Sequence, residues 1–163
     1  MAISVSNILI AIAGLVLLYS AYSDIRYRIL PDTASLVLVC LAVIRWSWAE
    51  DWGGLVWSFT CALGLFVLSA AVFARGWLGG GDVKLMTATS FFVGTNSFLS
   101  FIVVMSFAGG GLSLLVLFQI LVKRIGSMGR PRGLEVQHTV PYGAAIALAG
   151  LYILYVQVRS GVN

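Results

Sequence analysis

Charged residues are scarce in this chain of 163 residues, and histidine and cysteine are almost absent. Only 10% of the residues are charged, six of them acidic and ten basic, whereas a soluble domain carries about 25%. One histidine, His138, and two cysteines, Cys40 and Cys61, are too few for a zinc site, a disulfide framework or a Ser-His-Asp triad. We expect His138 to lie in a loop and both cysteines to be small core residues, and nothing in the sequence indicates a metal or cofactor.

Apolar residues are abundant instead. They make up 60% of the chain, and the mean hydropathy is +1.01. A helix needs about 20 apolar residues to span a bilayer. The sequence therefore predicts an all-α polytopic membrane protein with about six transmembrane helices and no extramembrane domain. We expect spans at about 4–23, 33–48, 53–73, 82–94, 97–122 and 140–158, the first of them retained because it is too long for a cleaved signal peptide.

The basic residues are distributed unevenly between the two expected sides of the membrane. Arg45 and Arg159 fall on one side, and eight of the ten fall on the other: Arg26, Arg28, Arg75, Lys84, Lys123, Arg124, Arg130 and Arg132. Because basic loops stay in the cytoplasm, we expect these loops to be cytoplasmic and both termini to be outside. The basic excess is then explained by orientation and does not indicate nucleic acid. Four tryptophans border the opposite side, as an aromatic belt would: Trp46, Trp48, Trp52 and Trp57.

Two aspartates lie at the expected cytoplasmic border. Asp24 closes the first apolar run, and Asp82 precedes the fourth. Acidic groups near hydrocarbon are costly and are usually functional. Two such carboxylates can form the catalytic pair of an aspartic protease, in which one takes a proton from water and the other polarises the scissile carbonyl. Gly79 and Gly81 would let the backbone approach a peptide or the second carboxylate closely.

Structural roles for these aspartates remain open on the sequence alone. Asp82 could cap the fourth helix, and Asp24 could pair with Arg26 or Arg28. Lys84 could steady the charge of Asp82 or could extend to the interface.

Two further features are interpreted mainly as structural. Asp32 is expected to be the N-cap of the second helix. Gly109, Gly110 and Gly111 are expected to mark a tight crossing or local bend in the fifth span, and the alternative is a hinge that admits a substrate helix.

Three ordered segments resemble the motifs of the type IV prepilin peptidases. Segment 79–85, GGGDVKL, resembles their Gly-x-Gly-Asp motif. Segment 24–32, DIRYRILPD, is similar to their first motif, an aspartate followed by basic residues and a Pro-Asn pair. Segment 140–145, VPYGAA, resembles their closing Pro-Tyr-Gly. The resemblance extends from residue 23 to about residue 151.

The resemblance implies that residues 1–163 form a single transmembrane peptidase domain in a bacterial cytoplasmic membrane. Asp24 and Asp82 would be catalytic, and the supporting motif residues would be Gly79, Gly81, Lys84, Arg26, Pro31, Pro141, Tyr142 and Gly143. The substrate would be a prepilin whose short basic leader is removed at the cytoplasmic face, after a glycine, while its apolar helix stays in the bilayer. Archaellin-like or pseudopilin substrates are the alternative within this class.

The sequence departs from the family pattern in two places. Asp32 stands where the family usually has asparagine. The loop between the first two spans has no cysteine, whereas long prepilin peptidases carry a domain with paired Cys-x-x-Cys motifs there. The short form is similar to the peptidases of Tad/Flp pilus systems, and methylation of the new N-terminus, an activity of many long forms, does not carry over.

Two other function classes fit a polytopic membrane protein. A proton-coupled transporter or channel could use Asp24 and Asp82 as a relay. Such a relay favours carboxylates spread through the membrane, whereas these two lie at one border. A non-catalytic scaffold subunit of a pilus or secretion machine would need neither aspartate. Substitution of the aspartates separates these classes from a peptidase.

Overall fold

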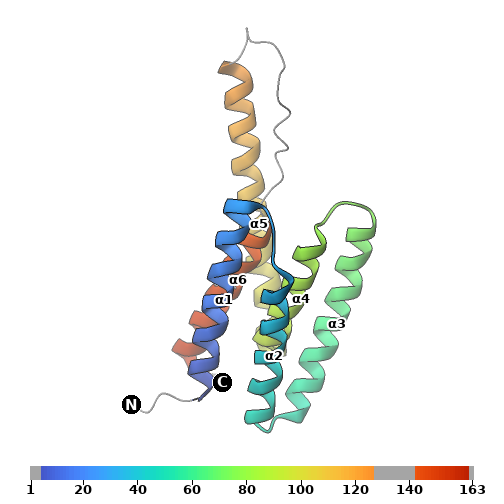
Figure 1. Ribbon diagram of the computed structural model, residues 1–163, viewed down its shortest axis with the longest axis vertical. Coiled ribbons are helices and arrows are strands. Elements are labelled where there is room, and N and C mark those ends of the chain that lie inside the picture. The colour runs from blue at the N-terminus through green and yellow to red at the C-terminus, as the bar shows by residue number, and fades with distance from the viewer. Residues whose placement is uncertain (1–4, 127–141, 162–163) are drawn as a thin grey trace.

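The computed structural model describes residues 5–126 and 142–161, and these residues form six helices (Figure 1). The helices are α1 (Val5–Tyr27), α2 (Asp32–Trp48), α3 (Trp52–Ala74), α4 (Gly80–Val93), α5 (Thr95–Gly126) and α6 (Tyr142–Ser160). The described residues contain no strand. The expected all-α class with six helices is therefore confirmed.

The helices differ in their capacity to cross a bilayer. Four of them, α1, α3, α5 and α6, are long and apolar enough to do so. The other two are shorter, with 17 residues in α2 and 14 in α4. At 1.5 Å per residue, α4 is only about 21 Å long, whereas the hydrocarbon layer is about 30 Å thick. At least one end of α4 is therefore surrounded by protein rather than by water.

The short helix α4 lies at the centre of the bundle. Within the described residues it contacts α2, α3, α5 and α6, while α1 packs against α2 and α6. Its sequence is apolar on nearly every face, and the residues from Ala88 to Val93 are all buried. A helix that is apolar all round belongs in an interior. The second half of α4 is consequently enclosed by other helices.

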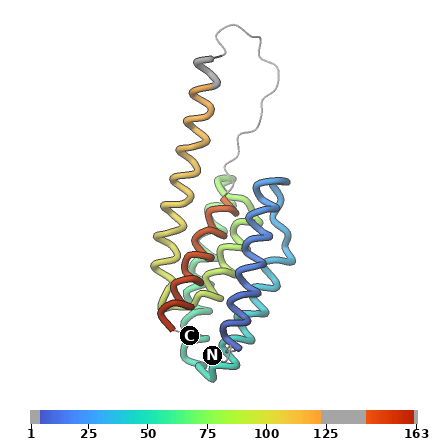
Figure 2. Tube along the Cα trace, turned by 90° about the vertical axis from the view of Figure 1, so that its left-hand side faces the viewer, coloured from blue at the N-terminus to red at the C-terminus, as the bar shows by residue number. Residues whose placement is uncertain are grey.

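Successive helices run in opposite directions, so each end of the bundle collects alternate helix ends (Figure 2). The end of α1 and the starts of α2, α4 and α6 meet at one end, where both aspartates of the sequence motifs lie. The start of α1 and the end of α6 lie at the other. The C-terminal part of α5 extends beyond the rest of the bundle on the aspartate side.

Three expectations about side-chain placement are wrong or incomplete. Cys40 is exposed on the surface of the bundle and Cys61 is only half-buried, so neither is a core residue. Trp46 packs inward, and its indole N–H donates to the carbonyl of Phe91 (3.3 Å), whereas Trp48, Trp52 and Trp57 are exposed as a belt requires. Because lipid-facing and core-facing residues are both apolar, hydropathy does not distinguish the two faces of these helices.

Candidate active site

Asp24 lies in the last turn of α1, because this helix continues to Tyr27 and does not end at the expected residue 23. Its side chain is buried, with 7% of the residue exposed. Oδ2 accepts a hydrogen bond from the backbone N–H of Ala144 (2.9 Å), and the carboxylate also bonds to the backbone of Gly143. These are free N–H groups in the first turn of α6. Asp24 therefore caps a helix that begins 118 residues after it, at Tyr142.

Asp82 lies in the first turn of α4. Its carboxylate bonds to the backbone of Gly79, which is the N-cap residue of the same helix. An acidic side chain at the third helical position that reaches back to the N-cap is one half of a capping box. The capping role considered for Asp82 is therefore present, and it fixes the carboxylate at the positive end of the α4 dipole.

The two carboxylates share one cavity of about 370 Å³. Its lining comes from the end of α1, the loop between α3 and α4, and the starts of α4 and α6: Asp24, Arg28, Gly76, Trp77, Leu78, Gly79, Asp82 and Tyr142. The charges of Asp24 and Asp82 are near enough to interact, and the charge of Arg28 acts on Asp24. Two acidic groups and one cation thus line the same small cavity.

Leu30 explains why two of the motif positions are glycines. A Cβ on Gly81 would lie 2.9 Å from Leu30 Cβ, and a Cβ on Gly143 would lie 2.8 Å from Leu30 Cδ2 and 2.9 Å from Asp24 Oδ2. Real Cβ atoms do not come so close to other atoms. Leu30 therefore packs between α4 and α6 and sets the separation of the two helix starts that hold the aspartates.

The loop that carries Leu30 has a defined conformation. Ser23 Oγ donates to the carbonyl of Ile29 (2.7 Å), and Arg28 has a left-handed backbone with φ of 56°. Pro31 is the N-cap residue of α2, in an extended conformation. The first motif thus fixes a tight return of the chain beside Asp24.

Several other residues singled out in the sequence lie away from the cavity. Lys84 forms an ion pair with Asp32 (2.7 Å) and does not approach Asp82. Asp32 makes no capping bond, because α2 begins at this residue and Pro31 occupies the N-cap position. Arg26 is exposed and does not line the cavity. Pro141 and His138 lie outside the described residues.

The three consecutive glycines of α5, residues 109 to 111, differ in what surrounds them. A Cβ on Gly109 would lie 3.8 Å from Ala145 Cβ and 3.9 Å from the ring of Tyr142, which are ordinary van der Waals contacts between α5 and α6. Gly110 and Gly111 have open space around their Cβ positions. None of the three glycines is therefore required by a tight crossing, and the helix continues through all of them.

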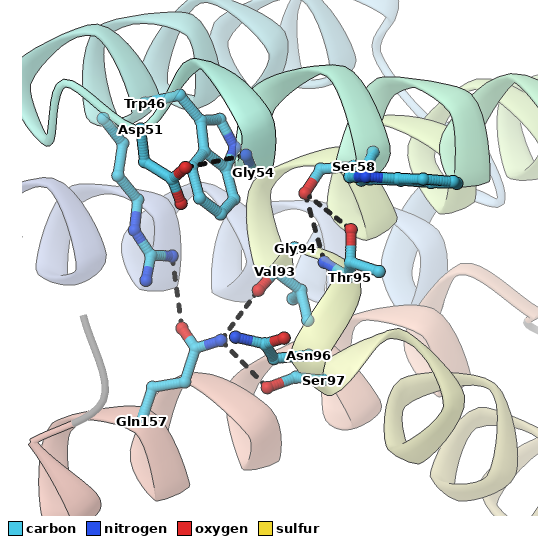
Figure 3. A pocket seen from close by; sticks show the side chains of 12 residues that line it. Trp46, Asp51, Gly54, Ser58, Val93, Gly94, Thr95, Asn96, Ser97 and Gln157 are labelled. Carbon is cyan, nitrogen blue, oxygen red and sulfur yellow. Dashed lines mark hydrogen bonds between the residues drawn. The ribbon is translucent and has the colours of Figure 1, made fainter.

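The far end of α4 holds a second polar cluster that sequence reasoning missed. Arg45 is 6% exposed, and its Nη1 donates to the carbonyl of Phe92 (3.0 Å) and to Oε1 of Gln157 (3.2 Å). Gln157 Nε2 donates to the carbonyl of Val93 (2.8 Å) and lies 3.2 Å from Ser97 Oγ (Figure 3). A lone glutamine and arginine within apolar runs were the available signal.

This cluster supplies hydrogen-bond donors to the last carbonyl groups of α4, a helix that ends inside the protein. The last carbonyls of an α-helix have no partner within the helix. Here Trp46, Arg45 and Gln157 bond in turn to the carbonyls of three consecutive α4 residues, 91 to 93. The cation also lies at the negative end of the α4 dipole. Both ends of α4 are therefore fixed, one by this cluster and the other around Asp82.

Within the described residues, no three histidine, cysteine, aspartate or glutamate side chains are grouped so that they could hold a metal ion. Neither the curated proteins nor the solved structures include a significant match to this chain. A family model described as the type IV leader peptidase family matches residues 11–114. That match contains Asp24, Asp82 and the glycines before Asp82, and it covers more than half of the chain. This membrane protein belongs to the type IV leader peptidase family.

Proposed function

We propose that this protein is a membrane aspartic endopeptidase that removes the short leader of type IV or Flp-type prepilins. The observation that supports the proposal most directly is the cavity that Asp24 and Asp82 share. Family membership indicates a peptidase, and two interacting carboxylates are the groups that an aspartic mechanism uses.

In this mechanism the two carboxyl groups share one proton between them. The ionised aspartate takes a proton from a water molecule, whose oxygen bonds to the scissile carbonyl carbon, while the protonated aspartate donates to the carbonyl oxygen. The C–N bond then breaks as its nitrogen gains a proton. The products are a carboxylate on the leader and an amine on the mature helix.

The proposed orientation places the aspartate end of the bundle in the cytoplasm of a bacterial cell. It is supported by the basic residues that the loops carry at this end, Arg26, Arg28 and Arg75, since basic loops remain cytoplasmic. A prepilin in the same membrane would present its leader at this end. Its apolar helix would stay in the bilayer, and cleavage after a glycine would separate the two.

The proposal is tested by co-expression of the protein with a Flp-type prepilin, with leader removal followed by gel shift and mass spectrometry. Asp24→Asn and Asp82→Asn are compared with the wild type, and Asp32→Asn is the matched control because Asp32 lies outside the cavity and pairs with Lys84. We expect both cavity variants to lose cleavage by a factor of about 100 to 10,000 at unchanged membrane levels, and the control to cleave normally.

Two results would contradict the proposal. Cleavage by both cavity variants at the wild-type rate would exclude the two-aspartate mechanism. Absence of cleavage by the well-folded wild type with several prepilins would exclude the substrate class and favour a transporter or scaffold.

A further inference from the structure

An apolar groove of about 500 Å³ opens beside the aspartate cavity. It runs between α3 and α5, and α4 and α6 form its floor. Its lining residues lie on α3, α4, α5 and α6 and in the loop before α4. On α5 the lining positions extend from residue 102 to residue 113, a length of about 16 Å at 1.5 Å per residue. The groove is therefore as long as about three turns of a helix.

The groove is continuous with the cavity that contains the aspartates. Leu78, Asp82 and Tyr142 line both spaces. Asp82 lies in the first turn of α4 and Met86 one turn further along the same helix, so the groove leads from the carboxylate toward the middle of the bundle. A chain that passes over Asp82 meets the cavity with Asp24 and Arg28 on one side and an apolar groove on the other.

The chemistry of the groove wall restricts its occupant to an apolar one. Apart from Asp82 and Tyr142 at its mouth, the polar lining side chains are three serines. The hydroxyls of Ser69, Ser106 and Ser113 each donate to a carbonyl one turn back in their own helix, at 2.7 to 2.8 Å. The wall therefore has little free hydrogen-bonding capacity to offer a polar ligand.

The two helices that flank the groove pack weakly within the chain. In their most apolar windows, 17% of α3 and 11% of α5 is buried, against 39% of α1 and 56% of α6. Gly110 lines the groove, is exposed, and has no atom within 4 Å of its Cβ position. Glycine at such a position lets another helix approach the backbone of α5 closely.

We propose that this groove binds the first turns of the substrate's apolar transmembrane helix, directly after the scissile bond. This inference rests on the proposed function and adds to it the location at which the helix is held. Continuity with the cavity determines the occupant, because a peptide cleaved beside Asp82 has its membrane-embedded part in the groove. Binding energy gained along the groove would then hold the scissile bond at the carboxylates.

Two adjacent α5 residues provide a matched test. Gly110→Leu fills the groove, whereas Gly111→Leu adds the same side chain to a position that also has open space but does not line the groove. We expect Gly110→Leu to lower kcat/KM for a full prepilin at least tenfold and to leave cleavage of a short soluble leader-junction peptide unchanged. Gly111→Leu should match the wild type with both substrates. Equal activity of the two variants on the prepilin would overturn the proposal.

A binding measurement separates this proposal from the peptidase function itself. A photo-crosslinking amino acid is placed at position 110 or 111 in the Asp82→Asn background, and a prepilin is co-expressed. A crosslink between position 110 and the first turns of the prepilin helix, absent at position 111, would support the groove even if cleavage failed. Crosslinks from position 110 to lipid alone would overturn it, even if the wild type cleaves.

Discussion

The Asp24 carboxylate accepts a hydrogen bond from the backbone N–H of Ala144 at 2.9 Å. The bond joins the last turn of α1 to the first turn of α6, so the position of this carboxylate depends on the last helix of the chain. Asp82 is held differently, through Gly79 at the start of its own helix. The two acidic groups of the cavity are therefore positioned by two separate helix N-termini, and Leu30 packs against both helices.

Gly143 is the most sensitive neighbour of Asp24. In Gly143→Ala the new Cβ would lie 2.9 Å from Asp24 Oδ2 and 2.8 Å from Leu30 Cδ2, so the carboxylate must move. A displacement of about 1 Å at a catalytic group can lower the rate about 100-fold, and we expect a loss of that order in leader cleavage. Gly64→Ala is the control, because nothing lies within 4 Å of that position. A normal rate in Gly143→Ala would show that Asp24 need not occupy this position.

Leu30 provides a test by compensation. The three atoms nearest to a Cβ on Gly81 all belong to Leu30, the first of them Leu30 Cβ at 2.9 Å. We expect Gly81→Ala to lower prepilin cleavage about tenfold or more, and the added change Leu30→Gly to restore part of the rate. The same Leu30→Gly change should not restore Gly143→Ala, because the contact with Asp24 remains. The measurement compares the cleavage rates of the two glycine variants, each with and without Leu30→Gly, at equal membrane levels. Equal rescue of Gly81→Ala and Gly143→Ala would contradict the packing described.

Gln157 is expected to matter for stability more than for chemistry. Gln157→Leu removes the donor to the Val93 carbonyl and an acceptor of the buried Arg45 guanidinium. An unsatisfied buried polar group costs about 1–3 kcal/mol, and we expect the free energy of unfolding in detergent to fall by that amount. Gln119→Leu makes the same change at an exposed position of α5 and should alter it by less than about 0.5 kcal/mol. Equal stability of the two variants would show that the cluster does not hold the end of α4.

Lys84 is expected to contribute little. Its ion pair with Asp32 is largely exposed, with 52% and 69% of the two side chains accessible. Exposed pairs of this kind contribute about 0.2–1 kcal/mol. Lys84→Met should therefore lower the unfolding free energy by no more than that and leave the cleavage rate within about twofold, since solvent screens its charge from the cavity. A large loss of cleavage with normal folding would instead support the role beside Asp82 that the sequence suggested.

The sequence was sufficient for the features that depend on local patterns. Runs of apolar residues predicted six helices, and the motifs around Asp24 and Asp82 singled out two carboxylates that line one cavity. These features can be recognised without the tertiary structure, because the length of a span and the rarity of a charge near lipid are properties of the sequence itself.

Contacts between distant helices were not predictable in the same way. Nothing in the residues around Asp24 indicates that its carboxylate will accept a hydrogen bond from the backbone N–H of Ala144. The partners of Arg45 on α4 and α6 lie 47 and 112 residues away. The expectation for Cys40 failed because it depends on which face of a helix turns inward, and the expectation for Asp32 failed because α2 begins one residue earlier than the cap required. In a membrane protein both faces are apolar, so the pattern does not record that choice.

Two contacts that α6 makes with the other helices have a consequence for biosynthesis. Ala144 holds Asp24, and Gln157 closes the end of the helix that starts beside Asp82. Both belong to α6, which follows the other five helices in the chain. A nascent chain that has inserted only its first five helices therefore has both acidic residues but neither of these contacts. The hydrogen bond that holds Asp24 therefore forms only after α6 has been synthesised and inserted.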